Sequence, residues 1–258
     1  MPHGGGPCFF MEWTRGPRDT WKRMAEWLRS VPGSLPAPPV ALLVVSGHWE
    51  APTTTVTSSA SPPLIYDYSG FPQSTYELTW PAAGSPELAA RVQGLLRKAG
   101  IDAGADGERG FDHGVFIPLK VAYPEARIPT VQLSLRAGLD PIEHLAIGRA
   151  LAPLRDEGVL IVGSGMSYHN MRGFMAPGTR EVSARFDEWL ATAVAADPAE
   201  RDAALAQWTQ APMARQSHPR EEHLLPLMVV AGAAGADRGR QVLRDEVMGA
   251  VVSAFRFD

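Results

Sequence analysis

Apolar residues recur along this chain in two patterns, and each pattern predicts one kind of element. Continuous apolar runs of strand length are typical of strands buried on both faces of a sheet. Together with one more polar run, they predict strands over residues 40–46, 53–59, 129–135 and 158–165. Apolar residues at helical spacing predict helices over residues 13–28, 86–100, 141–154, 183–195 and 199–208. Alternating valine and phenylalanine over residues 241–257 predict a final extended segment.

The succession of strands and helices predicts an α/β fold. We expect a single domain over residues 1–258, because a chain of this length can bury one large core and shows no break in composition. The expected architecture is a central mixed β-sheet flanked by helices on both faces. Sheets of this kind bind ligands at the ends of their strands. We therefore expect a functional site at that edge.

Charge and composition exclude several classes of function. The chain has 24 Lys and Arg against 28 Asp and Glu, a net charge of −4, which argues against nucleic acid and anionic membranes as partners. No apolar run approaches the roughly 20 residues of a membrane span, and the first residues do not resemble a signal peptide. The single Cys8 excludes an internal disulfide framework. We expect a cytoplasmic protein, either a monomer or a small homo-oligomer.

Histidines follow several of the apolar runs. His48 comes directly after the run 40–46, and His169 follows the run 158–165 through a stretch of small residues. A third, His223, stands beside Glu222 just before another apolar run, and we expect Pro219 to open a helix there, with both residues in its first turns. Neutral imidazoles suit Fe, Zn, Cu and Ni, and without thiolates such a site is open and catalytic.

Other histidines allow simpler interpretations. His3 precedes three glycines near the start of the sequence, so it can belong either to a glycine-rich ligand loop or to a disordered terminus. His113 follows Asp112 between two glycines, where a tight turn that presents the imidazole and an Asx turn with a satisfied histidine fit equally. His144 lies among apolar residues of a predicted helix, and we expect it to be an ordinary helix residue.

Six motifs, taken together and in this order, resemble those of the class III extradiol ring-cleavage dioxygenases, in their DOPA 4,5-dioxygenase branch. They cover nearly the whole chain and are His3-Gly4-Gly5-Gly6-Pro7, Ser46-Gly47-His48-Trp49-Glu50, Tyr66-Asp67-Tyr68-Ser69-Gly70-Phe71-Pro72, Asp112-His113-Gly114, His169-Asn170-Met171-Arg172 and His218-Pro219-Arg220-Glu221-Glu222-His223. Each motif alone is loose, whereas six in one order are specific. Unlike the family, this sequence has no strand before the loop of His3.

The resemblance implies a metal centre. It implies that His3, His48 and His223 bind a divalent metal, Fe²⁺ or alternatively Zn²⁺, with Glu222 in place of His223 if the alignment shifts by one residue. No organic cofactor is implied. The resemblance also implies that His169 is the catalytic acid and base beside the metal.

It implies a pocket for a small catechol as well, with O₂ as the second substrate. His113, which we also count as catalytic, and His218 are expected to line this pocket. The aromatic loop that contains Tyr68 and Phe71 fits equally as a packed surface loop or as an aromatic wall of the pocket, and we count both residues as substrate-binding. Each metal-binding histidine needs an acceptor for its second N–H. The candidate acceptors are Asp67, Asp112 and Glu222.

The expected activity is therefore extradiol cleavage of a catechol at a non-haem metal. Two other interpretations stay open from the sequence. An all-histidine site also suits Zn²⁺, so the chain can be a zinc-binding hydrolase or another non-oxygenase of the same fold. Alternatively, it can be a catalytically silent binding protein in which His3 is mobile.

Overall fold

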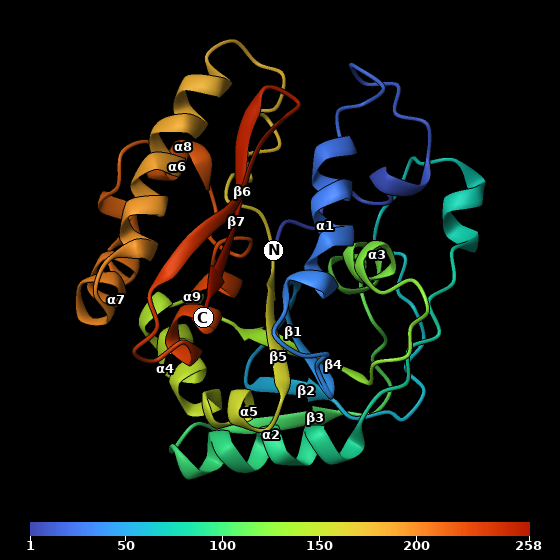
Figure 1. Cartoon of the computed structure of the whole chain (residues 1–258), viewed down its shortest axis with the longest axis vertical. Coiled ribbons are helices and arrows are strands. Elements are labelled where there is room, and N and C mark those ends of the chain that lie inside the picture. Colours follow the sequence, from blue (N-terminus) through green and yellow to red (C-terminus); the bar gives the residue numbers. More distant parts are fainter.

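A five-stranded mixed sheet lies at the centre of the fold (Figure 1). The computed structural model describes residues 1–258, and the strand order is β3-β2-β4-β1-β5. The strands are β1 (Ala41–Ala51), β2 (Thr54–Thr57), β3 (Ala103–Asp106), β4 (Thr130–Arg136) and β5 (Val159–Ser164). β1 pairs in parallel with β4 and β5, and β2 pairs in parallel with β3 and antiparallel with β4. The predicted mixed sheet is confirmed.

Helices cover both faces of this sheet. The α-helices are α1 (Lys22–Ser34), α2 (Pro86–Lys98), α3 (His113–Ala122), α4 (Pro141–Leu151), α5 (Pro153–Asp156), α6 (Thr179–Ala195), α7 (Pro198–Ala206), α8 (Ala214–Ser217) and α9 (Leu225–Ala233). Successive side chains of β1 point to opposite faces. Leu43 and Val45 join the core that includes residues of α4 and α9, whereas Leu42 and Val44 pack in the core that includes Phe116 of α3. Burial on both faces explains why the run is apolar without interruption.

The last part of the chain forms a separate two-stranded sheet, β6 (Gly239–Val247) and β7 (Ala250–Phe257). The predicted extended segment is thus an antiparallel hairpin, which turns at Met248 and Gly249. One face of the hairpin packs with α1 in a further core cluster that includes Met24 and Leu28. In Figure 1 the hairpin runs beside α6, between this helix and α1.

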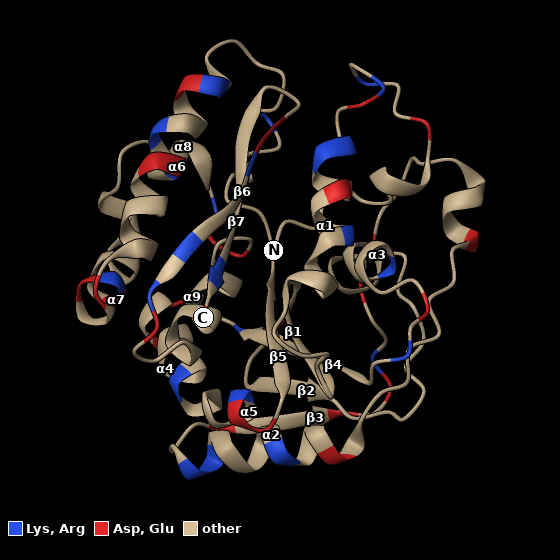
Figure 2. Ribbon diagram, in the orientation of Figure 1, with Lys and Arg blue, Asp and Glu red and all other residues tan.

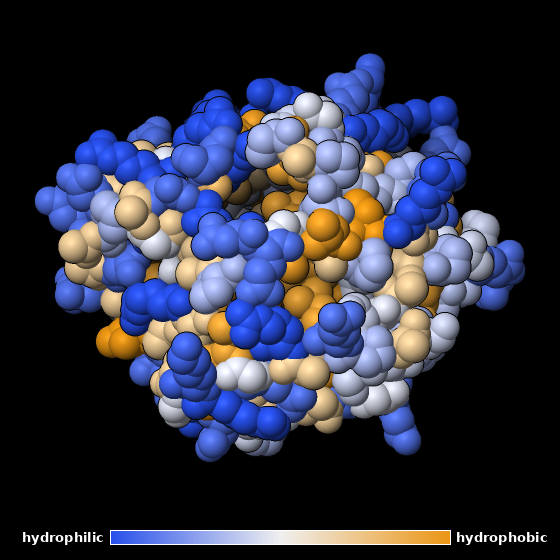
Figure 3. Space-filling view, turned by 60° about the horizontal axis from the view of Figure 1, so that its bottom comes forward, coloured by the Kyte–Doolittle hydropathy of each residue, from blue (hydrophilic) through white to orange (hydrophobic).

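Charged residues lie mainly on the outer helices, the hairpin and the loops (Figure 2). The space-filling view shows a mostly hydrophilic face, on which apolar residues gather around a hollow near the centre (Figure 3). No helix of the chain combines the length and the apolar content that crossing a bilayer requires.

Three elements differ from the sequence predictions. The first predicted helix begins nine residues later than expected, at Lys22 rather than at residue 13, because Gly16 with a φ of +123° and the following Pro17 interrupt it. Helix α3 replaces the turn expected around His113. Almost all of α3 is buried, so it lacks the amphipathic period that reveals a surface helix. The short strand β3, with Gly104 inside it, was not expected.

The segment that contains His223 also differs from the prediction. Pro219 does not open a helix; α9 begins at Leu225, with Pro226 in its first turn, where a missing N–H costs no helical hydrogen bond. Glu222 and His223 therefore lie in the turn before the helix. The carbonyl of His223 accepts a hydrogen bond from the N–H of Met166, 3.1 Å away, just beyond the end of β5.

Glycines let α9 pack closely against its neighbours, and this packing positions the turn of His223. A Cβ at Gly232 of α9 would lie 2.1 Å from the carbonyl oxygen of Leu145 in α4. A Cβ at Gly163 of β5 would lie 2.4 Å from the carbonyl oxygen of Pro226. Only glycine allows these backbone contacts.

We expect Gly232→Ala to lower the free energy of unfolding by about 1–3 kcal/mol, because the methyl group forces α4 and α9 apart. The matched control is Gly94→Ala in α2, where nothing lies within 4 Å of the added Cβ. This control should gain about 0.5–1 kcal/mol from helix propensity. Urea denaturation measures both, and equal changes in the two variants would contradict the packing argument.

Candidate metal centre

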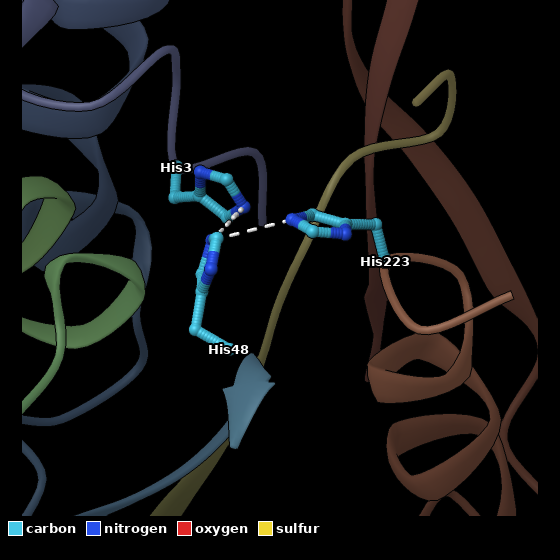
Figure 4. Close-up of side chains that lie close together, drawn as sticks. All are labelled: His3, His48 and His223. Carbon is cyan, nitrogen blue, oxygen red and sulfur yellow. Dashed lines mark hydrogen bonds between the residues drawn. The ribbon is translucent and has the colours of Figure 1, made fainter. Parts of the chain in front are cut away.

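Three histidines from distant parts of the chain meet beyond the carboxyl ends of the parallel strands (Figure 4). His3 follows the bridge between Pro2 and Gly165, His48 lies near the end of β1, and His223 lies in the turn before α9. The Nε2 atom of His48 is 3.3 Å from Nε2 of His3 and 3.2 Å from Nε2 of His223. One nitrogen of each ring lies within 4.8 Å of the other two. The structure thus brings together the three residues expected to bind metal.

His3 is buried and held by the backbone. This residue is only 2% exposed. Its N–H donates to the carbonyl of Gly165 at 3.2 Å, and Gly165 in turn donates to the carbonyl of Met1 at 3.1 Å. The interpretation of His3 as part of a disordered terminus was wrong, because pairing with the chain beyond β5 fixes this loop even without a preceding strand.

A glycine allows the other two histidines to approach each other. A Cβ at Gly47 would lie 2.9 Å from the carbonyl oxygen of Glu222 and 3.3 Å from Cα of His223. Because Gly47 has no side chain, the turn of His223 can rest directly on the end of β1. The Ser-Gly-His motif thus has a steric reason for its glycine.

The three imidazoles are neutral near pH 7. Burial lowers the pKa of His3 well below its usual range. Burial, followed by the neighbouring histidines His113 and His223, lowers the pKa of His48 to about 2. Burial lowers the pKa of His223 to about 4, although the hydrogen bond to Glu222 acts in the opposite direction. Neutral imidazole is the form that binds metal ions.

Hydrogen bonds on the far side of two rings direct lone pairs into the centre. Nδ1 of His3 lies 2.8 Å from the carbonyl oxygen of Gly4, and Nδ1 of His223 lies 3.0 Å from Oε1 of Glu222. Both Nδ1 atoms must therefore carry the proton, which leaves a lone pair on each Nε2. His48 can donate to only one of these two lone pairs. A cation at this point fits all three nitrogens, so the residues present suit a divalent metal.

Glu222 connects the metal centre to His169. Oε1 of Glu222 accepts from Nδ1 of His223 and lies 3.3 Å from Nδ1 of His169. Burial alone would raise the pKa of Glu222, but the hydrogen bonds from His169 and His223 outweigh it and lower this pKa. The rings of His169 and His223 stack with centroids 3.3 Å apart. Glu222 thus binds the outer edge of His223, and this geometry supports His223 as the third ligand.

Asp67 orients His113 on the opposite flank. Oδ1 of Asp67 accepts from Nδ1 of His113 at 2.7 Å and from its backbone N–H at 2.9 Å. Burial opposes ionisation of Asp67, but these hydrogen bonds outweigh it and lower the pKa of the carboxyl. The ring of His113 lies 4.0 Å from that of His48 between centroids. With Nδ1 occupied, Nε2 of His113 is left for another partner.

Aromatic rings continue this flank. The ring of Tyr68 meets the rings of His113 and Phe71 edge-on, with centroids 5.7 and 5.6 Å away. The hydroxyl of Tyr68 donates to the carbonyl of Thr75 at 2.6 Å, and burial raises the pKa of Tyr68 to about 12. Tyr68 therefore offers an aromatic surface here, with its hydroxyl already engaged.

Comparisons with known proteins identify the family of this chain. The family model for the catalytic LigB subunit of aromatic ring-opening dioxygenase matches residues 2–256. The chain belongs to this family. This LigB-family chain is 41% identical to a 4,5-DOPA dioxygenase extradiol of Beta vulgaris over 218 residues, which cover 83% of the chain and 81% of the relative.

A further relative and a solved structure support the same family. A 4,5-DOPA dioxygenase extradiol of Portulaca grandiflora is 43% identical over 213 residues, 81% of the chain and 77% of the relative. The crystal structure of an uncharacterized protein from Escherichia coli K12 superposes with a TM-score of 0.76 at 32% identity, covering 90% of each chain. The family inferred from the six motifs is confirmed, and the relatives named as dioxygenases support a ring-cleaving dioxygenase.

Two further histidines of the LigB-family chain lie outside the metal cluster. His218 is fully buried; its Nε2 lies 3.0 Å from the carbonyl oxygen of Ser167, its ring contacts Phe186, and burial lowers its pKa to about 3. Its Nδ1 has no hydrogen-bond partner, and its place in the pocket wall stays a prediction. His144 accepts from the N–H of Arg136 at 3.1 Å, so the ordinary structural role expected for it is confirmed.

One predicted contact is wrong, and it reveals residues that the sequence did not indicate. Asp112 accepts from no imidazole; its carboxylate binds Ser46, Gln132 and Arg109. A buried carboxylate needs several donors at once, and these come from β1, β4 and the loop before α3. Arg109 stands three residues before the Asp-His-Gly motif, and nothing in its local pattern distinguishes it from a surface arginine.

We expect a divalent metal to stabilise the LigB-family chain through the histidine cluster. Zn²⁺, or Fe²⁺ without oxygen, at about 100 times its Kd should add about 2.7 kcal/mol to the free energy of unfolding. His48→Ala and His223→Ala should abolish this gain, because each removes one of three nitrogens. Thermal unfolding with and without metal measures this gain in stability.

The matched control is His144→Gln, since His144 is a buried histidine outside the cluster. This variant should unfold at a lower temperature yet keep the full metal-induced rise. A rise that persists unchanged in His48→Ala would place the metal elsewhere.

Proposed function

We propose that this chain is a metal-dependent extradiol dioxygenase, which opens the ring of a small catechol with O₂ at a non-haem Fe²⁺. The observation that carries the proposal is the meeting of three neutral Nε2 atoms, from His3, His48 and His223, in a member of a ring-opening dioxygenase family. The proposal treats residues 1–258 as one catalytic domain.

Fe²⁺ held by the three histidines would supply coordination positions for a catechol and O₂, together with the electron exchange with O₂ that Zn²⁺ cannot supply. The protein contributes orientation to this chemistry. Gly4 and Glu222 fix the rings of His3 and His223 by their hydrogen bonds to Nδ1. Such outer partners hold the ligand geometry in place.

His169 is the proposed acid and base. Its Nδ1 faces Glu222, so its Nε2 edge is available to a substrate, and its side chain is 20% exposed, within reach of solvent or ligand. Because its ring stacks on His223, a catechol bound at the centre lies beside it. An imidazole can take a proton from a catechol hydroxyl and return one later in the reaction near neutral pH.

His113 and the neighbouring aromatic rings form the proposed substrate wall. Nε2 of His113 can hydrogen-bond a catechol oxygen, because Asp67 holds its Nδ1. Tyr68 and Phe71 can pack edge-on against an aromatic ring, as they already do against their neighbours. We propose His218 as a further part of this wall. The relatives named as 4,5-DOPA dioxygenases support a catechol as the proposed substrate, so L-DOPA is the first catechol to test.

We expect His169→Ala to keep its metal and lose about 10²–10⁴-fold in turnover, because only the proton-transferring group is removed. The assay loads the protein with Fe²⁺ anaerobically, adds L-DOPA or another catechol in oxygenated buffer, and follows O₂ uptake and the yellow ring-opened product. Metal analysis of the same samples reports occupancy.

His48→Ala provides the contrast, since it should lose both metal and turnover. Loss of metal from His169→Ala would instead make His169 a ligand. If the wild-type protein with Fe²⁺ bound opens no catechol, the proposed function fails.

A further inference from the structure

The end of β1 lacks part of the regular sheet pairing where it presents His48. Pairing of β1 with β4 runs from Leu42 to Val45 and resumes at Glu50, with a shift of register between them. Pairing with β5 stops at Ser46. His48 therefore lies in an irregular stretch, where sheet hydrogen bonds do not fix the backbone as they do earlier in the strand.

Side-chain groups hold both polar groups of the His48 backbone instead. Its N–H donates to Oγ of Ser46 at 3.2 Å, and its carbonyl oxygen lies 3.4 Å from Nη2 of Arg109. Both of these partners bind the same carboxylate. Oγ of Ser46 donates to Oδ1 of Asp112 at 2.8 Å, and Nη2 of Arg109 lies 3.4 Å from Oδ2.

Asp112 is fully buried and is itself fixed on several sides. Gln132 of β4 donates to Oδ2 of Asp112 and accepts from its backbone N–H. The guanidinium of Arg109 lies over the ring of Trp49, 4.6 Å from the centroid, so Arg109 is held in place as well. Asp112 also occupies the N-cap position of α3, whose first residue is His113. Its backbone carbonyl accepts from the N–H groups of Val115 and Phe116, and its side chain makes no capping hydrogen bond.

The contacts around the Asp112 carboxylate are so close that a shift of Asp112 displaces its neighbours. A Cβ at Gly114 would lie 2.5 Å from Oγ of Ser46, 3.0 Å from Cδ2 of His48 and 3.1 Å from Oδ1 of Asp112. The first turn of α3 therefore packs directly on the imidazole of His48. A shift of Asp112 moves the backbone of His48 and the start of α3 together, because packed interiors have no free space to absorb it.

We propose that Asp112, with Ser46 and Arg109, is a positioning group that sets the place of His48 Nε2 in the metal centre and ties it to His113. These residues touch neither metal nor substrate; they act through the backbone of His48 and the N-terminus of α3. This proposal rests on the proposed function, because the placement of His48 serves a metal centre.

Ser46→Ala tests the proposal, with Ser134→Ala as its matched control. Both serines are buried on strands of the same sheet, and both accept a backbone N–H, Ser134 from Thr55 at 2.9 Å. We expect Ser46→Ala to weaken Co²⁺ binding about 10–100-fold and to change the visible spectrum of bound Co²⁺. Ser134→Ala should lose comparable stability and leave both unchanged. Calorimetric titration and absorption spectroscopy measure these effects.

A second pair keeps the test decisive if Ser46→Ala does not fold. Arg109→Met removes the contacts to His48 and Asp112 at a side chain that is 23% exposed. Its control is Arg97→Met, because Arg97 also donates to a backbone carbonyl, that of Ala103 at 2.9 Å. Only Arg109→Met should weaken Co²⁺ binding.

The imidazole ¹⁵N–¹H spectrum of metal-free protein gives a readout that does not depend on the proposed function. The signals of His48 and His113 should move in Ser46→Ala and Arg109→Met and stay in place in the two controls. If they stay in place in all four variants, or if the wild-type protein binds Co²⁺ and the affinity is equal in test and control variants, the positioning role is overturned. If the wild-type protein binds no metal while these signals move as expected, the proposed function fails and the positioning role stands.

Discussion

Three neutral imidazoles with their Nε2 atoms turned toward one point are the constraint on which the site depends. At separations of 3.2 and 3.3 Å, the available protons cannot satisfy every nitrogen, since His3 and His223 both hold their proton on Nδ1. Burial keeps these rings uncharged and so prevents mutual repulsion of three cations. A divalent cation is the partner that satisfies all three nitrogens together. The protein thus builds the centre by directing the lone pairs of its imidazoles toward one point.

Carboxylates orient imidazoles on both flanks of this centre. Glu222 accepts hydrogen bonds from His223 and His169, and Asp67 accepts from His113. In each case the carboxylate binds Nδ1, which leaves the opposite nitrogen of the ring for metal or substrate. His169 therefore stands on one flank, beside Glu222, and His113 stands beside aromatic rings on the other.

The parallel sheet and its glycines determine how closely these groups can approach. Parallel strands β1 and β5 end at the same edge, which brings His48 near the loop of His3 that pairs beyond β5. Gly47 lets the turn of His223 rest on β1, and Gly163 lets α9 lie against β5. The position of His223 is therefore a consequence of backbone packing over much of the chain. The same packing connects Asp112 to the backbone of His48.

The sequence by itself determined the buried strands, most helices, the family and the three histidines that meet, because apolar period is a local property of a chain and motif order is read directly along it. Local pattern could not show that α9 begins at Leu225, or that α3, almost all of which is buried, is a helix. It also misassigned Asp112, whose partners come from separate strands and a loop. Tertiary structure alone decided which carboxylate faces which imidazole, because hydrogen-bond partners depend on how distant segments approach across the sheet.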